Sequence, residues 1–160
     1  MRAVAVNLDA LGDTGPLWRD FLTDAARRFA SISPLDPDAL PADRAAAAEE
    51  LDRWAEAGIG DWRHALERFA EDRAPVYLRP SSEANAALRA LAAAGARIGV
   101  YTDAPEPLAR VALAHLGAER RVEALETGTE ARERLVARLG GSDVVAAVTL
   151  ADLTKIKADG

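Results

Sequence analysis

The chain has 160 residues, a formal net charge of −6 and no cysteine. That length suits one domain with a small insertion, and a hydrophobic fraction of 49% is enough for a buried core. The acidic balance argues against a nucleic-acid partner, because phosphate backbones bind concentrated basic faces. Disulfides, thiol nucleophiles and thiolate metal sites are excluded. No stretch approaches the roughly 20 apolar residues of a membrane span, and no signal-peptide pattern opens the chain. We therefore expect a cytoplasmic protein without membrane association.

The first predicted element is a buried strand at residues 4–7. It leads into a loop that carries Asp9 and Asp13. Ligands of open α/β sheets bind beyond the carboxyl ends of the strands, so this loop is the first candidate for a functional site.

The region that follows is predicted to be a helical insertion. Apolar side chains recur there at helical spacing in three segments: residues 16–30, 44–57 and 61–71. No strand pattern interrupts them. We therefore assign residues 14–76 to a cap and residues 1–13 and 77–160 to the core.

The large aromatic residues and the histidines receive mostly structural roles. We expect Trp54 and Trp62 to lie in the core of the insertion, and Trp18 to lie near the mouth of a pocket. His64 and His115 are isolated on predicted helices, so packing or surface roles are favoured over metal ligation.

The remainder of the chain repeats one pattern, in which an Ala- and Leu-rich helix ends at a glycine and an apolar run follows. The pattern occurs at residues 81–94 and 98–101, 105–116 and 122–125, and 129–139 and 144–148. Glycine just past a helix end marks a left-handed cap, and Ser81 or Ser82 and Thr129 are candidate N-caps. Helices that alternate with short apolar runs predict an α/β fold, a doubly wound parallel sheet of about four strands with a Rossmann-type core.

The first strand and its loop resemble the opening motif of the haloacid dehalogenase-like (HAD) phosphatases, an apolar strand followed by Asp-x-Asp-Gly-Thr. Asn7 stands at the first Asp, Asp9 matches the second, and Ala10 and Leu11 replace Gly-Thr. In that family the first Asp is the nucleophile and the second is the general acid/base. An amide cannot form an aspartyl-phosphate intermediate. The resemblance thus implies a site without its nucleophile.

The helical insertion resembles the small cap of the phosphoglycolate-phosphatase branch of HAD proteins, which closes over the active site and selects the substrate. Residues 101–105 resemble the second motif, a strand that ends in Thr or Ser beside a helix N-terminus. The resemblance places a phosphate-binding position at Thr102 and Asp103. A threonine between a strand and a helix is also an ordinary cap, and that alternative remains open.

The third motif of the family is a Lys or Arg that offsets negative charge. The only lysines are Lys155 and Lys157, so a conventional lysine is excluded. Glu126 falls near the usual position, and Arg132 is a weak substitute within the following helix.

The fourth motif supplies acids that bind Mg²⁺, and only Asp152 remains near the position of its second acid. The resemblance implies Mg²⁺ if the protein is active and no cofactor otherwise. Asp9 and Asp152 could share a weakly bound ion. An Asp-to-Asn change at Asn7 could also be engineered to trap a substrate. The departures at Ala10, Leu11, Glu126 and Leu150 have no such explanation, so natural divergence is favoured.

These residues predict a protein of the HAD-like hydrolase family that has lost phosphatase activity and serves as a binding or interaction module. A small phosphorylated or anionic ligand is expected between cap and core, and a protein partner or homo-oligomer is compatible with an exposed helical face. The alternative is a phosphomonoester hydrolase with an atypical site and Asp9 or Asp13 as nucleophile. It requires a carboxylate, a cation and Thr102 within about 3 to 4 Å of one point.

Overall fold

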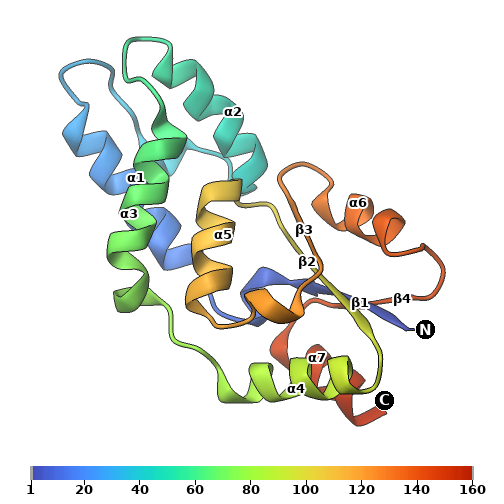
Figure 1. Ribbon diagram of the computed structural model, residues 1–160. Helices are drawn as coiled ribbons and strands as arrows, with labels where there is room; N and C mark the ends of the chain where they lie inside the picture. Colours follow the sequence, from blue (N-terminus) through green and yellow to red (C-terminus); the bar gives the residue numbers. More distant parts are fainter. Residues whose placement is uncertain (1, 160) are drawn as a thin grey trace.

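The computed structural model describes residues 2–159 and confirms the predicted α/β class. Four parallel strands form one sheet in the order β3-β2-β1-β4. The strands are β1 (Ala3–Asn7), β2 (Arg97–Thr102), β3 (Ala124–Thr127) and β4 (Val144–Ala147). The two longest strands, β1 and β2, lie in the middle of the sheet (Figure 1).

Helices cover both faces of the sheet, as a doubly wound fold requires. They are α4 (Ser82–Ala93), α5 (Glu106–His115), α6 (Ala131–Arg138) and α7 (Leu150–Asp159). Val4 and Val6 of β1 belong to one buried cluster with Leu88 and Leu108 of α4 and α5. Ala3 and Ala5 point to the opposite side, where α6 contributes Leu135. This alternation is the period of two expected of a strand.

Gly99 in β2 permits the close packing of α6. A β-carbon at this position would stand 2.5 Å from a methyl group of Leu135, which is closer than two carbon atoms can approach. Glycine in a strand interior often marks such a close approach. Gly95 and Gly117 serve differently, because each follows a helix with a positive φ, 87° and 75°, as the sequence predicted.

The insertion after β1 consists of helices and loops. Its elements are α1 (Gly15–Arg28), the short 3-10 turn Pro37–Ala39, α2 (Arg44–Ala55) and α3 (Trp62–Tyr77). Helix α3 is longer than predicted, and Pro75 lies inside it. The proline sits in the last turn, where it removes only one intrahelical hydrogen bond, and the helix closes with Leu78 N–H donating to the Ala74 carbonyl.

The insertion is packed against the rest of the molecule as well as within itself. Helix α3 lies along α5, and side chains of α1 to α3 belong to the same buried cluster as those of β1, α4 and α5 (Figure 1). Trp54 and Trp62 are buried as predicted. Their indole N–H groups donate to the Ser33 carbonyl at 3.0 Å and to an Asp52 carboxylate oxygen at 2.9 Å.

Two local predictions are wrong. The N-cap of α6 is Glu130, which has a left-handed backbone (φ 55°), and the predicted cap Thr129 makes no capping contact. Strand β3 begins at Ala124 rather than Val122, because residues 119–121 form a 3-10 turn before it. In both places a local turn displaces the boundary that the apolar pattern indicated.

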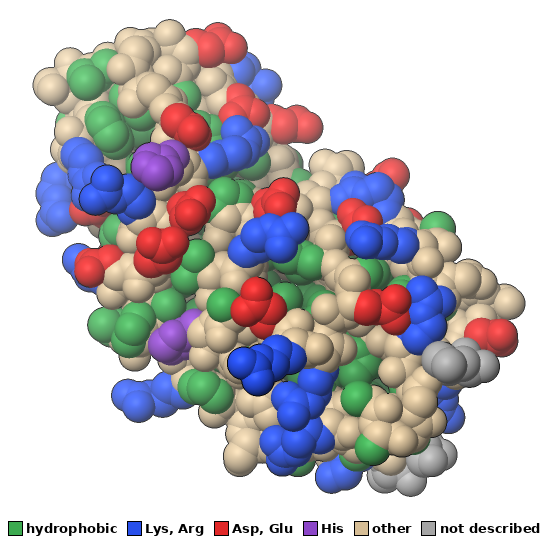
Figure 2. Space-filling view, in the orientation of Figure 1, with side chains coloured by type: hydrophobic (Ala, Val, Ile, Leu, Met, Phe, Trp, Pro, Cys, Tyr) green, Lys and Arg blue, Asp and Glu red, His purple; other side chains and the backbone are tan. Residues whose placement is uncertain are grey.

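Within residues 2–159, no helix combines the length and apolarity needed to cross a bilayer. On the face seen in Figure 2, arginine and lysine side chains stand beside aspartate and glutamate over most of the surface.

Candidate functional site

The candidate site lies where β1 and β2 end. Asn7 pairs with Tyr101 in the sheet, which brings the loops after both strands together. A cavity of about 700 Å³ opens there, between the strand ends and the insertion. Its lining includes Asn7, Asp9, Trp18, Arg19, Leu40, Arg44, Tyr101, Thr102, Asp103, Glu130, Arg132 and Glu133. The structure therefore brings four of the five predicted site residues together, and Trp18 lies in the wall as expected.

Asn7 is the last residue of β1 and caps the 3-10 turn Leu8–Ala10. Its side-chain oxygen accepts a hydrogen bond of 3.0 Å from the Asp9 backbone N–H. Burial raises the pKa of the neighbouring Tyr101 hydroxyl, although Arg132 and a hydrogen bond with the Asn7 side chain act in the opposite direction. Asn7 thus fixes the first turn of the loop with a neutral side chain.

Asp9 is held from two sides. One carboxylate oxygen accepts from the Thr14 N–H at 3.0 Å and from the Thr14 hydroxyl at 2.7 Å. The other oxygen accepts from the Arg44 guanidinium at 3.0 Å. Both oxygens are therefore engaged, and the charge of Asp9 is paired with a cation.

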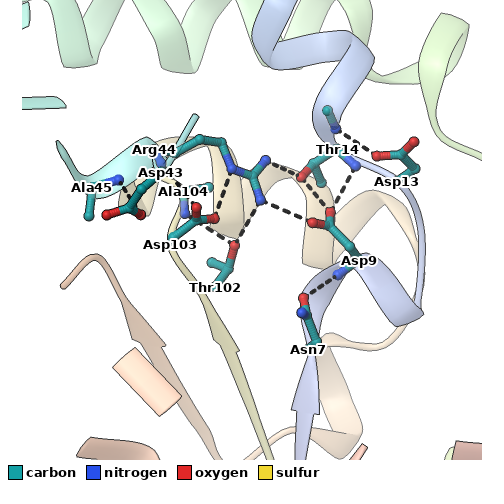
Figure 3. Close-up of polar contacts among 11 residues, drawn as sticks. Asn7, Asp9, Asp13, Thr14, Asp43, Arg44, Ala45, Thr102, Asp103 and Ala104 are labelled. Atoms are coloured by element: carbon teal, nitrogen blue, oxygen red, sulfur yellow. Dashed lines mark hydrogen bonds and ion pairs between the residues drawn. The ribbon is translucent and has the colours of Figure 1, made fainter. Parts of the chain in front are cut away.

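Arg44 is the central residue of the site, and it comes from the insertion (Figure 3). Its Nε donates to Asp103 at 2.9 Å and one terminal nitrogen donates to the Thr14 hydroxyl at 2.6 Å. The second terminal nitrogen reaches Asp9 at 3.0 Å and the Thr102 hydroxyl at 3.4 Å. Only 7% of Arg44 is exposed, so these contacts replace nearly all of its hydration.

The start of α2 places Arg44. Asp43 is the N-cap, and its side chain accepts from the Ala45 N–H at 3.3 Å. Arg44 follows as the first helical residue, and its own N–H donates to Asp103 at 3.0 Å. One carboxylate therefore binds both the backbone and the side chain of Arg44. The sequence pattern marked Arg44 only as the start of a predicted helix, and it carried no sign of this role.

Thr102 and Asp103 end β2 and occupy the predicted phosphate position. The Thr102 oxygen accepts from the Ala104 N–H at 3.2 Å, which is a local turn contact; the N-cap of α5 is Pro105, so the threonine is not the helix cap. Its contacts with Ala104 and Arg44 both use the oxygen as acceptor, which leaves its O–H as a donor. Burial opposes ionisation of Asp103, but its hydrogen bonds and ion pair with Arg44 outweigh this and lower its pKa.

Asp13 and Asp152 lie outside the lining of this cavity and have capping contacts. Asp13 accepts from the Gly15 N–H at 2.9 Å at the start of α1. Asp152 accepts from the backbone N–H groups of Val148 and Thr149, both at 3.1 Å, and these bonds lower its pKa. Each carboxylate stabilises a helix N-terminus.

The donor set does not fit Mg²⁺. The ion is held by carboxylates and substrate phosphate in near-octahedral geometry. Here the first position is the neutral Asn7, Asp9 is paired with the Arg44 cation at 3.0 Å, and Asp152 does not line the cavity. Among residues 2–159, no three His, Asp or Glu side chains gather closely enough to hold a metal ion.

Of the two residues considered for the third motif, Arg132 lines the cavity and Glu126 lies outside its lining. Glu126 of β3 faces Arg134 and Arg138 of α6, with nitrogen–oxygen distances of 3.4 Å in both ion pairs. Arg132 instead lines the cavity, with its guanidinium carbon 5.9 Å from the centre of the Tyr101 ring. Arg132 is therefore the cationic side chain that this helix presents to the site.

The sheet order, the helical insertion after β1 and a polar cavity at the strand ends define an α/β protein of the doubly wound class with a capped site. Residues 10–157 match the sequence profile of the haloacid dehalogenase-like hydrolases. The chain belongs to that family. The matched segment begins just after Asn7 and Asp9.

Solved structures share the fold at low sequence identity. CbbY from Rhodobacter sphaeroides in complex with phosphate is 18% identical, with a TM-score of 0.64 over 91% of this chain and 77% of CbbY. A CbbY variant from the same organism, in complex with xylulose-(1,5)bisphosphate, is 17% identical, with a TM-score of 0.61 and the same coverage. A structure described as a β-phosphoglucomutase from Thermotoga maritima is 17% identical, with a TM-score of 0.58 over 99% of this chain and 82% of that one. A comparison with curated protein sequences gave no match.

The pairing of Asp103 with Arg44 predicts a pH-dependent contribution to stability. Because the folded pKa of Asp103 is lowered, its contribution is present above the usual Asp value of about 3.9 and is lost as pH falls through the folded pKa. The Asp103→Asn variant should have a lower free energy of unfolding at neutral pH and a shallower decline between about pH 5 and pH 3. Urea unfolding at a series of pH values measures both.

Asp72→Asn is the control, because Asp72 is an exposed aspartate whose ion pair with Arg73 lies away from the site. It should keep the wild-type pH dependence. Equal slopes for wild type and Asp103→Asn would contradict the assigned role of the Asp103–Arg44 pair.

Proposed function

We propose that this protein is a HAD-family binding module that has lost phosphatase activity and holds a small anionic molecule in the cavity between insertion and strand ends. The observation that carries the proposal is the pairing of Asp9 with Arg44, beside an asparagine at the nucleophile position.

The loss of catalysis is argued from three positions. Asn7 has no carboxylate with which to form a covalent intermediate. Asp9 is bound by Thr14 and Arg44, so both of its oxygens already have partners within the chain. Asp152 caps α7 and does not line the cavity.

The alternative, an atypical phosphomonoester hydrolase, gains support from one observation. It requires a carboxylate, a cation and Thr102 at one point, and the Arg44 guanidinium lies within 3.0 Å of Asp9 and 3.4 Å of Thr102. The same guanidinium, however, stands between the two groups where a substrate oxygen would have to enter. That arrangement favours the binding module over the hydrolase.

An anionic ligand is supported by two arginines of the cavity rather than by its overall charge, because the lining carries four carboxylates (Asp9, Asp103, Glu130, Glu133) and three arginines (Arg19, Arg44, Arg132). Arg44 is paired with Asp9 and Asp103. Arg19 and Arg132 also line the cavity, and neither forms an ion pair within residues 2–159. A volume of about 700 Å³ lies in the range of small-molecule sites. The O–H of Thr102 remains a candidate contact to the anion.

The purified protein should not hydrolyse p-nitrophenyl phosphate or common sugar phosphates above background with Mg²⁺ present. The reason is that Asn7 has a neutral amide and that Asp9 is paired with Arg44. A colorimetric phosphate-release assay measures this. Turnover that disappears in Asp9→Ala or Asp13→Ala would establish the hydrolase instead.

Restoring the carboxylate with Asn7→Asp should not by itself create an efficient phosphatase. The Arg44 pairing of Asp9 and the capping role of Asp152 remain in this variant, and catalytic groups that act as a unit are not additive. Steady-state kinetics test this, and a kcat of about 1 s⁻¹ or more would show that the other positions are still competent.

Titration with phosphate or succinate, followed by backbone amide shifts, should perturb residues that line the cavity. Arg19→Gln and Arg132→Gln should each weaken binding by about five- to tenfold, the loss expected for one hydrogen bond of about 1 kcal/mol. Arg120→Gln removes an arginine outside the cavity and should leave affinity unchanged. Shifts confined to Arg120 and Arg121, with none in the cavity lining, would contradict anion binding at this site.

A further inference from the structure

We infer that four side chains at the strand ends form a guanidinium-binding cage, and that its occupant in the intact chain is Arg44. The cage residues are Asp9, Thr14, Thr102 and Asp103. The inference concerns the inner end of the cavity and stands whether or not the cavity also binds an anion.

The contacts match the shape of a guanidinium group. This cation is planar and presents N–H donors along three directions in its plane. In the cage each of the three nitrogens has its own acceptor: Asp103 for Nε, Thr14 for one terminal nitrogen, and Asp9 with Thr102 for the other (Figure 3). An ammonium group is a compact point charge and could not contact all of these acceptors at once.

The cage residues are also held by contacts that do not involve Arg44. Asp9 and Thr14 belong to the loop after β1, and their mutual hydrogen bonds do not involve Arg44. Thr102 is fixed by the Ala104 N–H at the end of β2. Thr14 and Thr102 are 0% and 2% exposed, so their orientations are set by the surrounding structure.

The cage can also be entered from solvent once Arg44 is shortened. The side chains of Asp9 and Asp103 are 35% and 39% exposed, which leaves one side of the cage in contact with water. Two carboxylates with no cation between them repel each other and attract a small cation. A free guanidinium ion is therefore expected to replace the missing side chain.

Occupation of the cage joins the insertion to the strand ends. Arg44 is the first residue of α2, and all four cage residues lie outside α2, so the contact fixes the first turn of that helix over the site. The inner end of the cavity therefore accepts a planar cation, and the side chain of Arg44 fills it.

Chemical rescue of Arg44→Ala tests the cage. Amide hydrogen exchange at Ala45 to Ala48 should be at least about tenfold faster in the variant, because local opening costs less once the contacts are lost. Guanidinium chloride at about 20 mM, far below denaturing concentrations, should restore most of the protection. Equal concentrations of NaCl or of urea, a planar neutral analogue, should not. Rescue by either of these, or no rescue by guanidinium, would overturn the inference.

Two further variants distinguish binding in the cage from a general effect of guanidinium on stability. Arg63→Ala removes an exposed arginine that pairs with Asp52 within the insertion, and amide hydrogen exchange in this variant should not respond to guanidinium. Arg44→Lys keeps the charge without the planar donor set, and it serves if Arg44→Ala does not fold. Its α2 amides should exchange faster than those of the wild type. Wild-type protection in Arg44→Lys would show that any cation suffices and would reject a guanidinium cage.

Discussion

The buried guanidinium of Arg44 determines how the ends of β1 and β2, the loops that follow them and the start of α2 are arranged. Such a group is tolerated only when carboxylates offset its charge and every donor has a partner. For Arg44 the partners are supplied by the ends of two adjacent parallel strands, whose register is set by the pairing of Asn7 with Tyr101. The loops after β1 and β2 and the start of α2 must therefore hold fixed mutual positions. The register of the sheet brings together the partners that a buried arginine needs here.

Under the proposed function, the same contact would separate ligand binding from catalysis in this member of a hydrolase family. A catalytic acid must exchange its proton with a substrate, whereas the oxygens of Asp9 bind the chain itself. The rest of the cavity does not depend on that chemistry. Its arginines, the aromatic side chains Trp18 and Tyr101 and its volume do not depend on a carboxylate at position 7.

The fold was predictable because its signals are local. Apolar periodicity and glycine caps define the helices and strands after residue 77, and parallel strands place Asn7, Asp9, Thr102 and Asp103 at one edge. Arg44 was not predictable, since nothing near it in sequence distinguishes it from seventeen other arginines. Its cage partners lie 30 to 59 residues away. For Asp152 a local interaction overrides the role expected from its place in the sequence. Its position suggested a metal ligand, but its carboxylate caps α7.

The shared core of α3 and α5 has a consequence for how the protein can be divided. Side chains of the insertion and of one face of the sheet belong to one buried cluster, and within residues 2–159 only the opposite face, under α6, has a cluster without the insertion. An insertion of this kind is not a transplantable module: excising residues 15–77 would expose the apolar face of α5 to water. In evolutionary terms, the two parts can change only in step, each constrained by the surface of the other.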